Sequence, residues 1–357
     1  MSKRIHYLDN LTLLVKLSYR IFNAINTSGS YHRFVNRLAR DTIHKSQILN
    51  DGTIPERVYK KIQWYMVESV FMGEILANLT DHSINKKEKE GLIYLGAIMA
   101  LFDVFIDDFK FEKRVVAELF EEVVSPGKRS SSPGETAIEK VYHLYLERLV
   151  NTVSKEHWQE MNKHFDLILY QIQSDQQMKE NNTEENVNKI TMGKGGVAIL
   201  LCSAILLPIS DSFKKAMHEL GGFIQMMNDC QDIYKDTIEG ITTFVHFRKS
   251  YREIFDKLNR QRNITLREIK SLSCSYRGRS ETIFYFNAMF IVISYKLQKY
   301  AEVCNYSLDF KIIAALKKKD FRINPFSPGA VAGCFGKIMR YDFEACEKTP
   351  DFKFEDQ

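Results

Sequence analysis

The chain has 357 residues, 45% of them hydrophobic and 27% charged, which is enough to bury a sizeable core as one large domain or two ordinary ones. Its net charge of +5 suits a small anionic substrate but is far too low to indicate nucleic-acid binding.

Helical periodicity dominates the sequence. Only seven prolines and 17 glycines interrupt it, and apolar residues recur between them at three- and four-residue spacing, without alternating strand patterns. No internal repeat or composition shift marks a domain boundary. We therefore predict an all-α, single-domain helical bundle of roughly ten or more helices over residues 1–357. Residues 317–357 form a less regular C-terminal segment.

One of these helices is predicted from about Pro55 to Leu79. Five bulky apolar residues mark one of its faces: Trp64, Val67, Val70, Phe71 and Ile75.

The longest apolar run covers residues 197–209, and it contains Ser203 and Pro208. It is shorter than the roughly 20 residues that a membrane-spanning helix needs, so we interpret it as a buried core helix and expect no transmembrane segment. The first 20 residues lack the apolar stretch and cleavage site of a secretory signal. Six cysteines without a CxxC pair fit reduced thiols, and we expect a cytoplasmic protein.

A first acidic region lies at residues 102–112, among aromatic and branched apolar side chains. At helical spacing, Asp103 and Asp107 share one face, and Asp108 and Glu112 share another. An ionised carboxylate is costly to bury there unless a cation or a hydrogen bond compensates it. Solvent-facing carboxylates explain any single cluster equally well.

A second acidic region lies at residues 228–236 and contains Asn228, Asp229, Asp232 and Asp236. In a continuous helix, Asn228, Asp232 and Asp236 form one row at i, i+4 and i+8. Such hard oxygen ligands suit Mg²⁺. Two acidic regions in one chain favour a metal site over solvated side chains.

Together the two regions resemble the motifs of the class I isoprenoid synthase superfamily, which includes terpene cyclases, trans-prenyltransferases and squalene or phytoene synthases. The resemblance spans about residues 91–243 and is closest to the microbial class I terpene synthases. It implies two helices that face each other across a central apolar cavity. It also implies three Mg²⁺ ions, bound by the acidic motifs, that hold a prenyl diphosphate.

The second motif, Asn228-Asp229-x-x-Asp232-x-x-x-Asp236, is similar to the Asn/Asp-Asp-x-x-Ser/Thr-x-x-x-Glu motif of terpene cyclases. Asp232 and Asp236 depart from the commonest residues but remain oxygen ligands. It also resembles the second aspartate-rich motif of prenyltransferases.

The first motif aligns in two ways. One is Asp103-x-x-x-Asp107-Asp108, as in squalene and phytoene synthases; the other is Asp107-Asp108-x-x-x-Glu112, as in several microbial cyclases. The resemblance implies metal ligands among Asp103, Asp107, Asp108, Glu112, Asn228, Asp229, Asp232 and Asp236, and the sequence does not choose between the alignments.

Diphosphate-binding residues follow from the same resemblance. Lys194 resembles a lysine that starts a core helix in prenyltransferases, Lys235 precedes the last acid, and Arg340-Tyr341 resembles an Arg-Tyr pair of bacterial cyclases. Without the acidic motifs, Lys194 reads as a surface residue, and Arg340-Tyr341 as an ordinary surface pair. Asp107, Asn228 and Lys194 are the candidate catalytic residues. No clear counterpart of the Gly-Lys-x-x-Arg stretch of chain-elongating prenyltransferases is present.

Residues one helical turn before each motif are expected to line the cavity, although ordinary core packing explains each one singly. They are Leu95, Gly96, Met99, Ala100, Leu220, Phe223 and Ile224.

The sequence thus predicts a Mg²⁺-dependent class I terpene synthase, a lyase that ionises a prenyl diphosphate. The alternatives are a prenyltransferase or head-to-head condensing enzyme, and a non-catalytic helical protein that binds an isoprenoid or a partner. A homodimer is left open.

Overall fold

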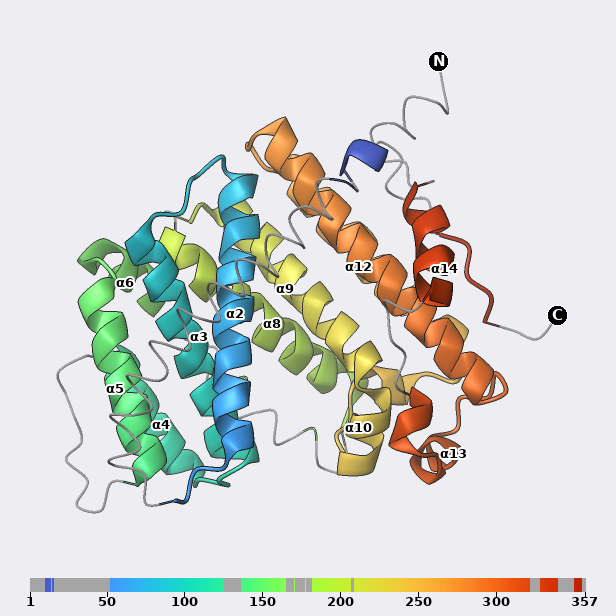
Figure 1. Cartoon of the computed structure of the whole chain (residues 1–357), viewed down its shortest axis with the longest axis horizontal. Helices are drawn as coiled ribbons and strands as arrows, with labels where there is room; N and C mark the ends of the chain where they lie inside the picture. The colour runs from blue at the N-terminus through green and yellow to red at the C-terminus, as the bar shows by residue number, and fades with distance from the viewer. Residues whose placement is uncertain are drawn as a thin grey trace. The chain divides into compact units, whose positions relative to one another are not determined.

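Figure 1 shows a computed structural model of the chain, which describes residues 10–13, 15, 52–124, 136–164, 170, 177, 182–206, 209–321, 328–339 and 350–354. The regular structure in these residues is helical throughout, and no strand occurs among them. The all-α prediction is therefore confirmed.

The chain divides into two compact units. Unit 1 comprises Met1–Leu17, Gln173–Gly196 and Asp211–Gln357, and unit 2 comprises Ser18–Ile172 and Val197–Ser210. The single-domain bundle with a central cavity stays a prediction.

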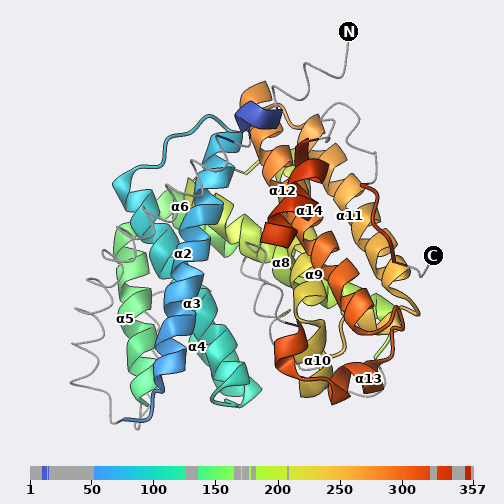
Figure 2. The same cartoon turned by 45° about the vertical axis from the view of Figure 1, so that its right-hand side comes forward.

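Unit 2 is built on helix α3, which packs against α2, α4 and α5 (Figures 1 and 2). Its helices are α2 (Glu56–Leu79), α3 (Lys86–Asp107), α4 (Lys113–Val124), α5 (Ala137–Thr152) and α6 (Lys155–Asn162), together with the last ten residues of α8.

The start of α3 is fixed by a capping box. The Asn85 side chain accepts a hydrogen bond from the Glu88 amide, and the Glu88 carboxylate accepts one from the Asn85 amide. At Gly96, a Cβ atom would lie 2.6 Å from both the Tyr65 carbonyl oxygen and Ser69 Oγ, so glycine permits close approach of α2. These features fix how the carboxyl end of α3 lies beside α2.

Helix α2 confirms the helix predicted from about Pro55 to Leu79, and its predicted face only in part. Val70 and Ile75 are buried, but Trp64 and Phe71 are 63% and 38% exposed. The buried face also carries Ile62 and Met66. The helix has bulky apolar residues on two sides, and periodicity alone does not say which side packs on α3.

Unit 1 is organised around α11, which packs against α9 and α12, while α12 also packs against α14. Its elements are α8 (Glu184–Leu206) up to Gly196, α9 (Asp211–Gln231), α10 (Ile233–Glu239), η2 (Phe244–Phe247), α11 (Tyr251–Ser271), α12 (Tyr276–Val303), α13 (Phe310–Ala315), η3 (Lys318–Phe321) and α14 (Pro328–Met339). Helix α14 lies within the segment that the sequence predicts to be less regular.

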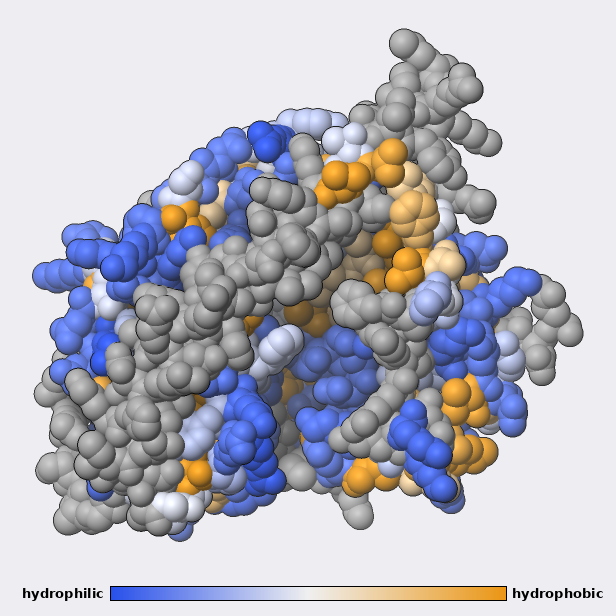
Figure 3. Space-filling view, viewed as in Figure 1, coloured by the Kyte–Doolittle hydropathy of each residue, from blue (hydrophilic) through white to orange (hydrophobic). Residues whose placement is uncertain are grey.

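An aromatic cluster forms the core of unit 1. Phe290 of α12 packs against Phe223 of α9 and Phe255 of α11, with ring centroids 6.3 and 5.6 Å apart. Near the end of the chain, Phe354 packs on Phe255 at 5.0 Å. Some apolar surface stays outside this core: Val331 and Phe335 of α14 are exposed, and Figure 3 shows apolar atoms gathered over α12 and α14.

Helix α8 is the one described helix that is long and apolar enough to cross a membrane. In its most apolar window 78% of the residues are buried inside the protein, which agrees with the predicted core helix at residues 197–209. The five described cysteines, at positions 202, 230, 274, 304 and 334, are free thiols.

Candidate functional site

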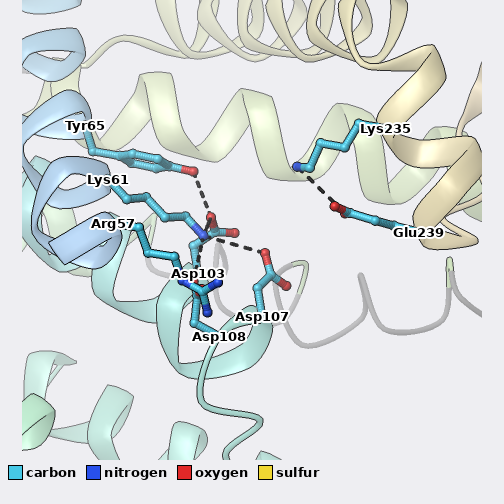
Figure 4. Close-up of polar contacts among 8 residues, drawn as sticks. All are labelled: Arg57, Lys61, Tyr65, Asp103, Asp107, Asp108, Lys235 and Glu239. Atoms are coloured by element: carbon cyan, nitrogen blue, oxygen red, sulfur yellow. Dashed lines mark hydrogen bonds and ion pairs between the residues drawn. The ribbon is translucent and has the colours of Figure 1, made fainter. Parts of the chain in front are cut away.

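Three carboxylates at the carboxyl end of α3 converge on one ammonium group. We call Asp103, Asp107 and Asp108 the first acidic cluster. Lys61 of α2 places its Nζ atom 2.8 Å from Asp103 Oδ2, 3.3 Å from Asp108 Oδ2 and 3.8 Å from Asp107 Oδ2 (Figure 4). This geometry is that of a cation-binding site, with the lysine as its occupant.

Two further α2 side chains complete the cluster. Arg57 Nη2 lies 3.3 Å from Asp108 Oδ1, and the Tyr65 hydroxyl donates a 3.1 Å hydrogen bond to Asp103 Oδ2. Although burial lowers the pKa of Lys61, the charges of the three carboxylates outweigh it and raise that pKa above its ordinary value. Burial, together with the Asp103 charge, raises the pKa of Tyr65 well above its usual range, so the phenol stays a donor.

Sequence reasoning missed these partners. Arg57, Lys61 and Tyr65 stand at i, i+4 and i+8 of α2 and so share one face. The sequence signal for them was a row of polar side chains on a helix that is apolar on its other sides.

The prediction that Asp108 and Glu112 share a helical face is wrong. Helix α3 ends at Asp107, Asp108 caps it, and Lys110 has a positive φ of 53° before α4 begins at Lys113. Glu112 therefore lies outside α3. The convergence of Asp103, Asp107 and Asp108 corresponds to the first of the two alignments, and Glu112 does not join it.

The second acidic region lies where one helix passes into another. Helix α9 ends at Gln231, Asp232 leaves helical geometry with φ −98° and ψ 13°, and α10 begins at Ile233. Helix α10 ends at Glu239 and is capped by Gly240, whose φ of +71° permits the left-handed cap, and the Ile241 amide donates to the Asp236 carbonyl. The acids therefore lie around the junction between the long helix α9 and the short helix α10.

The acids that gather differ from the predicted row. Asn228 is exposed, whereas Asp229 and Asp236 are only 5% and 7% exposed. The predicted row of Asn228, Asp232 and Asp236 is therefore wrong in detail: the carboxylates that act on one another are Asp229, Asp232 and Asp236, which stand at i, i+3 and i+7. We call these three the second acidic cluster.

Asp229 is held between two helices. Its carboxylate accepts hydrogen bonds from Gln225 Nε2 at 3.2 Å and from Thr191 Oγ1 of α8 at 3.5 Å. Burial raises the pKa of Asp229 to about 7, against the hydrogen bond from Gln225 and the charge of Lys194.

The pKa of Asp236 is raised further than that of Asp229. Burial, with the charges of Asp229 and Asp232, raises the pKa of Asp236 to about 8. Within the described part of the chain, no ion pair shorter than 4 Å reaches any of the three carboxylates of this cluster. The second acidic cluster thus lacks the close cations that the first cluster has.

Lys194 lies in the middle of α8, so the prediction that it starts a helix is wrong. Its neighbours explain its position. A Cβ on Gly195 would lie 2.1 Å from the Gly221 carbonyl oxygen, and a Cβ on Gly221 would lie 2.1 Å from that of Gly195. This backbone contact between α8 and α9 brings the half-buried Lys194 close enough for its charge to act on Asp229.

Two more lysines act on the second acidic cluster. Lys235 lowers the pKa of Asp236, and its Nζ lies 3.9 Å from Glu239 Oε2 (Figure 4). Lys296 of α12, which the sequence reading missed, donates a 2.9 Å hydrogen bond to Gln231 Oε1 and interacts with the charge of Asp232. Burial lowers the pKa of Lys296. The sequence signal was a lysine directly after a long run of mostly apolar and aromatic residues.

The predicted cavity residues are mainly buried. Leu95, Ala100, Leu220 and Phe223 have no exposed surface, and Met99 and Ile224 are half-buried. Gly96 is explained by its contact with α2, and Phe223 by its contact with Phe290. Their role beside a substrate stays a prediction. Arg340 and Tyr341 lie outside the described residues.

No three His, Cys, Asp or Glu side chains among the described residues stand close enough to enclose a metal ion by themselves. Mg²⁺ is usually held by one or two carboxylates plus substrate phosphates and water, so a closed protein cage is not required. Buried carboxylates with raised pKa values and no close cation are a donor set that fits such an ion.

No protein-family model and no curated protein matches the chain. Two solved structures are similar to it. A geranyltransferase from Legionella pneumophila is 14% identical over 75% of this chain and 99% of its own, with a TM-score of 0.39. An isoprenoid synthase family member from Thermotoga neapolitana DSM 4359 is 12% identical over 70% and 98%, with a TM-score of 0.38. We draw no conclusion about activity from similarity at this level.

Proposed function

We propose that the protein is a Mg²⁺-dependent class I terpene synthase that ionises a prenyl diphosphate and converts the carbocation to a cyclic terpene. One observation carries the proposal: three lysines, which come from three different helices, act electrostatically on the three carboxylates of the second acidic cluster. Lys194 acts on Asp229, Lys235 on Asp236 and Lys296 on Asp232. Carboxylates for metal ions beside lysines for phosphate oxygens suit a metal diphosphate, which carries both charges.

The donor set assigns the residues that would hold Mg²⁺. These are Asp229, Asp232 and Asp236, with the exposed Asn228 amide as a further oxygen donor, and the first acidic cluster. Bound there, Mg²⁺ supplies electrostatic stabilisation of the departing diphosphate.

The chain's own groups bind the leaving group. Lys194, Lys235 and Lys296 donate to phosphate oxygens, and their positive charges stabilise the negative charge that develops as the carbon–oxygen bond breaks. Burial disfavours the charged form of Lys296, and a phosphate partner would stabilise that form.

The carbocation requires apolar and aromatic surroundings that exclude water. Within unit 1, the second acidic cluster ends a helix whose preceding turns bury Leu220 and Phe223. Leu95 and Ala100 stand in the same relation to the first acidic cluster in unit 2. We propose that apolar positions such as these keep water from the carbocation.

A head-to-head condensing enzyme is the second candidate. The convergence of Asp103, Asp107 and Asp108 matches the squalene and phytoene synthase alignment of the first motif better than the cyclase alignment, which needs Glu112. A chain-elongating prenyltransferase and a non-catalytic isoprenoid-binding protein remain further alternatives.

The test is incubation of purified protein with Mg²⁺ and C10 to C25 prenyl diphosphates, followed by product analysis. Cyclic products from a single substrate support the terpene synthase. Products formed from two identical chains indicate the condensing enzyme, and products that require isopentenyl diphosphate indicate the prenyltransferase. No diphosphate release with any substrate contradicts all three.

A further inference from the structure

The two acidic clusters differ in how their charge is compensated. In the first acidic cluster, Lys61 Nζ lies within 3.8 Å of a carboxylate oxygen from each of its three aspartates. In the second acidic cluster, lysines act on the carboxylates only from beyond ion-pair distance. Among the described residues, the first cluster therefore contains a cation in contact with its carboxylates, and the second does not.

The contacts around the Lys61 ammonium fix its position between the three carboxylates. Its side chain is 28% exposed, and it extends from a helix that packs directly on α3. Tyr65 donates to Asp103, the same carboxylate that lies 2.8 Å from Lys61 Nζ, and Arg57 binds the far oxygen of Asp108. Because the ammonium is covalently tethered, its local concentration does not fall on dilution, unlike that of a free ion.

We propose that Lys61 is a built-in counter-cation of the first acidic cluster, which a divalent ion must displace in order to bind there. Lys61 then sets the metal affinity of this cluster. The inference deepens the proposed function, but it concerns metal binding by the free protein and needs no substrate.

Charge balance supports this competition. Among the described contacts, the three carboxylates carry three negative charges and Lys61 with Arg57 supplies two positive charges, so these five side chains together carry one net negative charge. A divalent ion added beside both cations would meet strong repulsion at contact distance. With the Lys61 ammonium displaced, the same ion would face three carboxylates and Arg57.

Asp107 is where displacement can begin. Its side chain is 57% exposed, against 11% for Asp103 and 18% for Asp108, and its contact with Lys61 Nζ is the longest of the three at 3.8 Å. A metal ion can reach Asp107 from solvent while Lys61 still holds Asp103.

The experiment is Mn²⁺ binding to the metal-free full chain, measured by electron paramagnetic resonance of free Mn²⁺, for the wild type, Lys61→Met and Lys60→Met. Lys60 is the matched control because it is 72% exposed and pairs only with Glu56 of its own helix. We expect Lys61→Met to bind one more Mn²⁺ ion than the wild type. The affinity for this additional ion is expected to be at least about tenfold higher than the affinity of the wild type for its most weakly bound ion. Lys60→Met is expected to bind Mn²⁺ like the wild type. Adding Asp103→Asn to Lys61→Met removes the gain.

Equal Mn²⁺ stoichiometry and affinity in the wild type and Lys61→Met overturn the proposal. If metal-free Lys61→Met is unfolded, circular dichroism replaces the binding curve: recovery of helix content on adding Mn²⁺ supports the proposal, and no recovery at saturating Mn²⁺ overturns it. The outcome is separate from catalysis, because a protein that makes no terpene can still show the gain, and an active synthase can fail to show it.

Discussion

Gly195 and Gly221 meet backbone to backbone where α8 crosses α9, and neither position has room for a methyl group. The crossing sets Thr191 and Lys194 beside Asp229. The two glycines therefore help to position the side chains around Asp229.

Gly221→Ala is expected to destabilise the protein by about 3 kcal/mol, because the new Cβ would lie 2.1 Å from a backbone oxygen that no side-chain rotation can relieve. Chemical denaturation measures this. Gly336→Ala is the control, since Gly336 lies inside α14 with nothing within 4 Å of an added Cβ. There alanine is expected to leave stability unchanged or raise it by up to about 1 kcal/mol. Equal effects at both glycines contradict the close contact.

The periodicity of apolar residues predicted individual helices well, because the formation of a helix depends mainly on residues that are near one another in sequence. The helix from about Pro55 to Leu79 and the core helix at residues 197–209 are both found. The buried face of α2 was not predictable, since Trp64 and Phe71 are as apolar as the residues that pack on α3, and only the tertiary contact decides between them.

The site was predictable in its acids and not in its cations. The carboxylates cluster in sequence, whereas Lys61 and Lys296 come from helices distant in the chain, so no local pattern joins them to Asp103 or Asp232. The sequence did not predict that Asp229 is buried and Asn228 exposed, because the packing of α9 against α8 and α11 decides which face of α9 is buried. Glycine and capping signals mark the end of α10 at Gly240 but give no sign of the helix break at Asp232.

The pH dependence of stability follows from the second acidic cluster. Asp229 and Asp236, with pKa values of about 7 and 8 against 3.8 ordinarily, keep protons in the folded chain that the unfolded chain has already lost. The folded state therefore binds more protons between about pH 4 and pH 8, and the free energy of unfolding falls as pH rises through that window. The slope is at most about 1.4 kcal/mol per pH unit for each carboxyl.

Urea denaturation with EDTA at pH 5.5, 7 and 8.5 checks this sign. Asp236→Asn replaces the ionisable carboxyl group with an amide of nearly the same size. This substitution is expected to reduce the loss of stability at high pH. Added Mg²⁺ is expected to restore stability at pH 8.5 more than at pH 5.5, since it binds the ionised carboxylates. A wild type that becomes more stable from pH 5.5 to 8.5 without metal contradicts the assignment.

Lys296 is predicted to bind diphosphate. Lys296→Met is expected to weaken the binding of magnesium diphosphate about tenfold, which corresponds to the loss of one charge-assisted hydrogen bond of about 1.4 kcal/mol. Isothermal titration calorimetry measures the affinity. Lys299→Met, on the same helix, is the control: Lys299 pairs with Glu302 at 2.5 Å, and the described contacts do not link it to Asp232. Comparable affinities in both variants argue against the role of Lys296.

The central claim is that the protein ionises a prenyl diphosphate with Mg²⁺ and needs Asp107 and Asn228 for this reaction. Release of inorganic diphosphate from C10 to C25 prenyl diphosphates, measured with and without Mg²⁺ for the wild type, Asp107→Ala and Asn228→Ala, tests it most directly. We predict Mg²⁺-dependent release by the wild type and loss of at least about 99% of it in each variant, roughly 2.7 kcal/mol in the activation barrier, with helix content by circular dichroism unchanged. Substantial release by both folded variants, or release by the wild type without any divalent ion, contradicts the account.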